Sequence, residues 1–116
     1  MERGVAVTGM GIISAIGDSI PLILESLLTS ESGITTLDLL ESNHAHAIKV
    51  GEVKITNQSL AEALNLPSNH TFTRTALLGT VAAKAAVASA RITDIQRYKT
   101  GLISATTVGG MDATER

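Results

Sequence analysis

The sequence predicts an α/β fold, in which helices pack on a mostly parallel sheet. Three short apolar segments, at residues 5–8, 48–55 and 100–105, have the composition and pattern of strands. Segments with helical spacing lie between them, and the connections are long enough to join parallel strands. With 116 residues and no internal repeat, the chain forms at most one modest domain.

A glycine-containing loop separates the first strand from the first helix. Residues 5–8 are apolar and β-branched, which predicts a strand buried on both faces, and residues 9–17 form the loop. Asp18 or Ser19 caps the helix, and Pro21 lies in its first turn, where a missing N–H is harmless. The apolar residues that follow have the spacing of an amphipathic helix: Ile20, Ile23, Leu24, Leu27 and Leu28.

The rest of the chain continues the alternation of strands and helices. Residues 34–47 have no steady period and are interpreted as a connection, whereas residues 48–55 alternate between apolar and polar side chains, as a strand does. Residues 60–66 predict a short helix. The Ala-rich segment 71–91 predicts a long helix packed on the sheet, and residues 100–105 predict the last buried strand.

Within that long helix, one face is predicted to be apolar and one polar. Leu77, Val81, Ala85 and Ala88 make up the apolar face, which we expect to cover the sheet.

Composition excludes several classes of protein. The nine Lys and Arg residues are scattered, which argues against a nucleic-acid surface. No apolar run approaches the roughly 18 residues of a membrane span, and no cleavage site follows the N-terminus, so we expect a cytoplasmic protein. The absence of cysteine excludes disulfides, thiolate metal sites and a cysteine nucleophile within these 116 residues.

The pair Gly9 and Gly11 invites comparison with a dinucleotide-binding loop. That loop needs G-x-G-x-x-G, a helix that starts at once, and an acid about 20 residues further on. Here Ser14 replaces the third glycine, the helix starts only near Ser19, and no acid follows the next strand at that distance. The glycines are therefore interpreted as structural, because they allow a sharp turn and a close approach. A small dinucleotide-binding domain stays open as an alternative.

Two further groups of residues are candidates for a functional site. His44 and His46 could face the same side of an extended segment, and His70 would add a third nitrogen, but no carboxylate completes a recognisable metal spacing. The sequence therefore predicts no metal site. The second glycine pair, Gly109 and Gly110, is typical of a turn between a strand and a helix.

Several stretches together resemble the N-terminus of β-ketoacyl-acyl-carrier-protein synthases. They are "VAVTGMGIISAIG", "VGEVK", the Ala-rich helix led by Phe72, and "TGLISATTVGGMDATE", in this order and over nearly the whole chain. The resemblance implies a partial thiolase-like fold, in which residues 1–116 are part of the first α/β half and end before the catalytic residues. In that fold Gly9 and Gly11 belong to a tight turn and hold no cofactor.

The resemblance also implies a reaction. A Cys thiolate accepts an acyl group from acyl-carrier protein, malonyl-carrier protein loses CO2, and its enolate attacks the thioester. Two histidines assist, and no cofactor or metal is needed. The family's Cys and both His lie downstream of Arg116, and His44, His46 and His70 do not match them, so these 116 residues alone are expected to be inactive.

The implied partners are acyl-carrier protein and an acyl thioester, with assembly into a homodimer or heterodimer. Neither nucleic acid nor membrane is expected to bind. A second alternative is a chain-length-factor-like subunit, which keeps the fold, lacks the Cys and serves as the non-catalytic half of a heterodimer.

Val108 is the one candidate residue for the substrate pocket. It precedes Gly109 and Gly110, at a position that lines or gates the acyl pocket in relatives, and a small side chain there would admit a longer or differently shaped acyl chain.

Two stretches depart from the family pattern. Residues 64–72 carry no basic residue where relatives often dock carrier protein, and residues 105–107 depart from the usual Gly-Ser-Gly. These departures suggest a divergent member for a secondary metabolite. An aliphatic sheet face left uncovered would also promote self-association.

Overall fold

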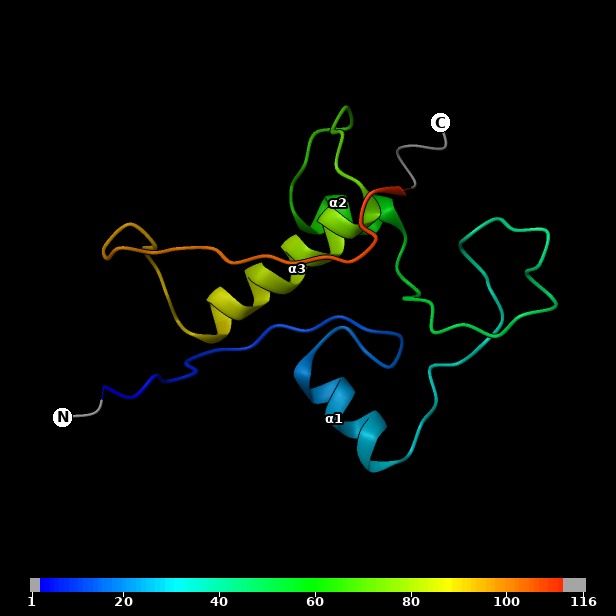
Figure 1. Ribbon diagram of the computed structural model, residues 1–116, viewed down its shortest axis with the longest axis horizontal. Helices are drawn as coiled ribbons and strands as arrows, with labels where there is room; N and C mark the ends of the chain where they lie inside the picture. Colours follow the sequence, from blue (N-terminus) through cyan, green and yellow to red (C-terminus); the bar gives the residue numbers. More distant parts are fainter. Residues whose placement is uncertain (1–2, 112–116) are drawn as a thin grey trace.

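The computed structural model describes residues 3–111 and places three helices in them: α1 (Ile20–Leu28), α2 (Asn57–Ala63) and α3 (Arg74–Ser89). α3 crosses the centre of the molecule, α2 packs against it, and α1 lies apart from that pair (Figure 1). Long connections join the helices, and the molecule extends 57 × 40 × 25 Å. The two ends of the predicted domain, residues 1–2 and 112–116, lie outside the described residues.

The helix predictions are confirmed, with small shifts at the ends. Ser19 is the N-cap of α1 and a proline occupies its first turn, as the sequence predicts. Thr56 caps α2 by accepting a hydrogen bond from the N–H of Ser59 at 3.1 Å, so this helix starts and ends three residues before the predicted segment. Thr73 caps α3 in the same way through the N–H of Ala76 at 3.3 Å.

The predicted parallel sheet is absent from residues 3–111. The β-type pairings there are two isolated bridges, Ser14 with Gly17 and Thr35 with Val50. Residues 5–8 and 100–105 are extended without being strands, and Val5 and Ile103 are 98% and 100% exposed. A strand persists only where a neighbour takes up its backbone hydrogen-bonding groups, and neither segment finds such a neighbour among the described residues.

The buried core lies between α2 and α3. Leu60 and Leu77 are 2% and 0% exposed, and Ala61 completes the cluster. Partly buried side chains of the connections and of α3 itself pack around it: Ile13, Ile55, Leu64, Leu66, Leu78 and Val81. The Lys84 ammonium donates to the carbonyl oxygen of Ala63 at 2.8 Å, which places a cation at the C-terminus of α2.

A second face of α3, made of small residues, contacts residues 9–11 and faces residues 102–110. This face has the i, i+3, i+4, i+7 spacing of one side of a helix and consists of Gly79, Ala82, Ala83, Ala86 and the C-cap residue Ala90. Its Ala82, Ala86 and Ala90 meet the backbone at residues 9–11, and its Gly79 and Ala83 face residues 102–110 across a groove. α3 thus contacts the chain directly after the first extended segment and borders a groove along the second.

The predicted apolar face of α3 is only half right. Leu77 and Val81 are buried or partly buried, but Ala85 and Ala88 are exposed. Successive residues of a helix point about 100° apart, so a small rotation of α3 changes which residues face a neighbour. Residues 9–11 contact Ala82, Ala86 and Ala90 instead of Ala85 and Ala88.

α1 uses only part of its apolar surface. Ile23 and Ser26 are buried, and the Ser26 hydroxyl donates to the carbonyl oxygen of Ile16 at 2.8 Å, tying the helix to the preceding loop. Leu24, Leu27 and Leu28 are each more than half exposed. The amphipathic pattern is therefore present while most of the surface it would bury remains uncovered.

Candidate functional site

The first glycine pair is packed against α3. A Cβ built on Gly9 would lie 2.5 Å from the carbonyl oxygen of Ala86 and 2.7 Å from the Cβ of Ala90. A Cβ on Gly11 would lie 2.6 Å from the backbone nitrogen of Ala86 and would also collide with the carbonyl of Ala82. Only glycine lets the two backbones approach this closely.

This packing differs from a dinucleotide-binding loop. In such a loop the glycine turn leads directly into the helix whose N-terminus holds the phosphate. Here α1 begins at Ile20, nine residues after Gly11, and the amide of Met10 donates to the hydroxyl of Ser89 at 3.4 Å. The glycines face a helix side, and no phosphate-binding turn forms in the described part of the chain.

The three histidines are not assembled into a metal site. His44 and His46 are exposed, and His70 Nδ1 accepts a hydrogen bond from the N–H of Phe72 at 3.2 Å. Among residues 3–111 no group of three or more His, Cys, Asp or Glu side chains is placed to hold a metal ion. In the same residues, no helix combines the length and hydrophobicity needed to cross a bilayer.

The second glycine pair borders a groove of about 710 Å³ between α3 and residues 102–110. The groove is lined mainly by small and hydroxyl-bearing side chains, among them Thr73, Thr75, Gly79, Thr80, Ser104 and Thr106. A Cβ on Gly109 would meet the Thr106 hydroxyl oxygen at 2.7 Å, and Gly110 has φ +85°, a conformation that favours glycine. Both glycines thus shape one end of the groove.

Val108 is adjacent in sequence to residues that line this groove, but it is not one of the lining residues in the described part of the chain. Its side chain is 66% exposed, and the lining passes from Thr106 to Gly109. Its role in an acyl pocket stays a prediction.

An apolar groove of about 560 Å³ lies between α1 and the segment that contains Gly9 and Gly11. Residues 9–12 and Ala86 form one wall, and α1 forms the other with Ile20, Ile23, Leu24 and Leu27. This groove contains the uncovered apolar surface of α1.

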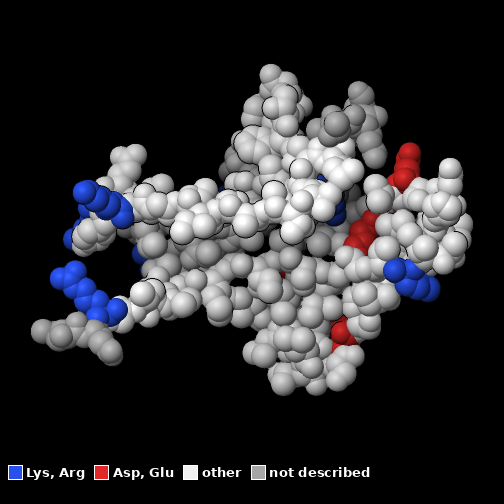
Figure 2. Space-filling view, viewed as in Figure 1, with Lys and Arg blue, Asp and Glu red and all other residues white. Residues whose placement is uncertain are grey.

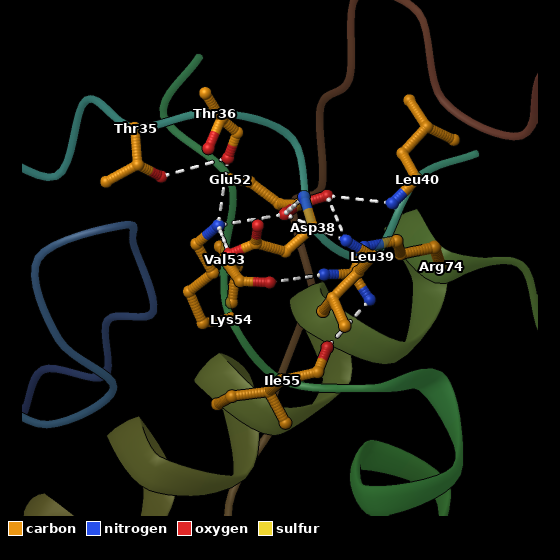
Figure 3. Close-up of polar contacts among 10 residues, drawn as sticks. All are labelled: Thr35, Thr36, Asp38, Leu39, Leu40, Glu52, Val53, Lys54, Ile55 and Arg74. Carbon is orange, nitrogen blue, oxygen red and sulfur yellow. Dashed lines mark hydrogen bonds and ion pairs between the residues drawn. The ribbon is translucent and has the colours of Figure 1, made fainter. Parts of the chain in front are cut away.

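A polar cluster that the sequence interpretation missed joins residues 36–40 to residues 52–54 (Figure 3). The Glu52 carboxylate accepts hydrogen bonds from the N–H groups of Asp38 and Leu40, both at 2.9 Å, and from that of Leu39 at 3.1 Å. Lys54 Nζ lies 3.1 Å from Glu52 Oε2 and 2.5 Å from the carboxylate of Asp38.

These contacts stabilise the charged forms of both side chains. The backbone N–H of Asp38, with those of Leu39 and Leu40 and the Lys54 ammonium, lowers the pKa of Glu52 from 4.5 to about 2, against the opposing effect of burial. The hydrogen bond to the Asp38 carboxylate, reinforced by Glu52, raises the pKa of Lys54. A signal for the pair was available, because the alternation in "GEVKI" places Glu52 and Lys54 on the same side of an extended segment.

Arg74, the first residue of α3, fastens the same segment to the helix. Its guanidinium donates to the carbonyl oxygens of Val53 at 2.7 Å and Ile55 at 2.9 Å, and to the side-chain oxygen of Asn57 at 2.7 Å. The cluster is therefore anchored to the core region of the molecule.

The charged side chains on one face of the described molecule do not form a stripe (Figure 2). On the face drawn in Figure 2 the Lys and Arg side chains lie mostly toward the two ends, and the surface between them is largely uncharged. This agrees with the scattered basic residues of the sequence and lacks the continuous basic patch of a nucleic-acid-binding face.

Comparison with known proteins identifies the family. The family model of the beta-ketoacyl synthase N-terminal domain matches residues 2–116. Searches of curated proteins and of solved structures gave no match. The family match covers almost the whole chain. The chain therefore belongs to the β-ketoacyl synthase N-terminal domain family, whose members are condensing enzymes of the acyltransferase type.

Proposed function

We propose that the chain is the N-terminal part of a 3-oxoacyl-[acyl-carrier-protein] synthase. The complete enzyme carries out the decarboxylative Claisen condensation of an acyl thioester with malonyl-carrier protein, in fatty acid or polyketide-type synthesis. The observation that carries this proposal is the family match over residues 2–116.

The arrangement of α3 supports a scaffolding role in that enzyme. One small-residue face of this helix contacts residues 9–11 and faces residues 102–110. The adjoining extended segments carry β-branched side chains that are exposed, among them Val7 and Ile103. β-Branched residues in extended backbone are the usual content of a buried strand. We infer that residues 5–8 and 100–105 become strands of the synthase sheet when the rest of the protein supplies their neighbours.

The chemistry itself requires groups that these residues lack. Condensation proceeds through a thiolate, which is nucleophilic near neutral pH when a helix N-terminus or a histidine lowers its pKa. The 116 residues contain no cysteine, so they supply the frame and not the nucleophile, and they are inactive by themselves. Acyl-carrier protein and an acyl thioester are the partners, in a cytoplasmic homodimer or heterodimer.

The full-length protein tests this function. It is incubated with acyl-carrier protein loaded with short, medium or long acyl chains and with carboxyl-labelled malonyl-carrier protein. We expect a covalent acyl-enzyme by mass spectrometry, release of labelled CO2 and a product longer by two carbons. The 116-residue chain alone should give none of these.

Two outcomes would contradict the proposal. A folded full-length protein that forms neither acyl-enzyme nor product with any chain length is not a synthase. A protein that forms no acyl-enzyme itself but is required by a cysteine-containing partner is a chain-length-factor-like subunit.

A further inference from the structure

Three successive backbone amides converge on one carboxylate in the polar cluster. Glu52 Oε2 accepts from Asp38 N–H at 2.9 Å, and Oε1 accepts from Leu40 N–H at 2.9 Å. The N–H of Leu39 lies between the two oxygens, at 3.2 Å and 3.1 Å. Consecutive N–H groups pointing into one concavity form a nest, an arrangement that proteins use to hold anions.

Lys54 supplies the charge of this nest. Its ammonium donates to Glu52 at 3.1 Å and to the carbonyl oxygen of Thr36 at 3.1 Å, besides its ion pair with Asp38. The Glu52 side chain is only 8% exposed, although most residues of the surrounding connection are exposed. The carboxylate is therefore enclosed by its donors.

The nest has supports that do not involve Glu52. Thr35 and Val50 exchange two backbone hydrogen bonds, at 2.9 Å and 2.8 Å, directly beside the cluster. Lys54 holds residues 36–38 through the Thr36 carbonyl and the Asp38 carboxylate. Because these contacts do not involve the Glu52 side chain, we expect them to hold the three amides in place when that side chain is removed.

We propose that the amides of Asp38, Leu39 and Leu40, with the ammonium of Lys54, form an anion-binding site that Glu52 fills as an internal ligand. The occupied site latches residues 36–40 onto residues 52–54. Emptied of its side chain, the site binds a small free carboxylate, because formate and acetate carry the same two acceptor oxygens and the same charge as Glu52.

Glu52→Ala in the full-length protein tests this proposal, with sodium formate as the probe. We expect the variant to have a lower Tm than the wild type, and formate to raise that Tm with a saturable dependence on concentration. Sodium chloride at equal ionic strength should not. In amide NMR spectra, the Asp38, Leu39 and Leu40 protons should shift upfield in the variant and return downfield with formate.

Matched variants separate this effect from general salt stabilisation. Glu41→Ala removes an exposed carboxylate from the same connection. Its Tm, and the dependence of that Tm on formate concentration, should equal those of the wild type. Glu52→Gln keeps the side-chain volume but loses the charge, so it should be less stable than the wild type and should gain nothing from formate, because its amide blocks the site.

Two results would overturn the proposal. One is a formate response of equal size in the wild type, Glu41→Ala and Glu52→Ala. The other is a Glu52→Gln variant with the stability and amide shifts of the wild type, which would show that no anion is required. Because Glu52→Gln preserves packing, this second result is accessible even if Glu52→Ala does not fold.

Discussion

The α2–α3 core and the two extended segments both contain large apolar side chains but differ sharply in how far they bury them. Leu60 and Leu77 are 2% and 0% exposed, whereas Val5 and Ile103 are 98% and 100% exposed. A helix satisfies its own backbone and needs only a side-chain contact, which α2 and α3 give each other. A strand needs a neighbour for its backbone, and the described residues offer none. The comparison teaches that α2 and α3 supply each other's contacts, whereas the extended segments depend on neighbours that the described residues do not provide.

The largest expected effect is in the helical core. Leu77→Ala empties a fully buried site and should lower the free energy of unfolding by about 3 kcal/mol or more. Val7→Ala should cost less than about 0.5 kcal/mol in the 116-residue chain, because that side chain is exposed. Urea unfolding followed by circular dichroism measures both. Equal losses in the two variants would break the comparison.

Gly11→Ala probes the contact between the first extended segment and α3. The added Cβ would collide with Ala82 and Ala86, so we expect a loss of about 1–3 kcal/mol, as for other overpacked sites. Gly4→Ala is the control in the same segment, since a Cβ there meets nothing within 4 Å. Thermal unfolding of the two variants should therefore differ clearly, and a matching pair of curves would disprove the contact.

Gly79→Ala asks whether the groove beside α3 is filled in the complete enzyme. A Cβ at Gly79 meets nothing within 4 Å, and alanine favours a helix interior over glycine by about 0.5–1 kcal/mol. The 116-residue chain should thus become more stable. A loss of stability in the full-length protein alone would show that another part of the protein occupies the groove.

Acid should weaken the polar cluster selectively. The pKa of Glu52 is depressed to about 2, so its stabilising contribution is complete above pH 4.5 and is lost as the pH falls toward 2. Glu52→Gln has no such contribution to lose. The difference in urea midpoint between wild type and Glu52→Gln should shrink steadily across this range, and a constant difference would contradict the assignment.

Val108→Phe should have little effect on stability, because the side chain is 66% exposed. If Val108 gates the acyl pocket, the bulkier ring shortens the acyl chains that the full-length enzyme accepts. Product lengths by mass spectrometry measure this, and an unchanged profile would remove Val108 from the pocket.

The helices could be predicted from the sequence because their signals are local. Ser19 stands at the N-cap position of α1, although its side chain makes no capping hydrogen bond, and Thr73 caps α3 through its side chain. Pro21 fits a first turn, and the apolar spacing repeats within one element. The strand signals are equally clear at residues 5–8 and 100–105, yet a strand also depends on a neighbour that local sequence does not specify.

The candidate site was less predictable for a similar reason. The residue type of Gly9 and Gly11 indicated a close approach, but not that Ala82, Ala86 and Ala90 would be the partners, since that choice depends on how α3 is rotated. Glu52 was missed because its donors lie 12 to 14 residues earlier in the chain.

Hydrogen exchange at the amides of Val7 and Ile103 tests the central claim most directly. If these segments are strands that the rest of a synthase completes, their amides exchange without protection in the 116-residue chain and are strongly protected in the full-length protein. Unprotected amides in the folded full-length protein, or protected amides in the 116-residue chain as a monomer, would contradict the account.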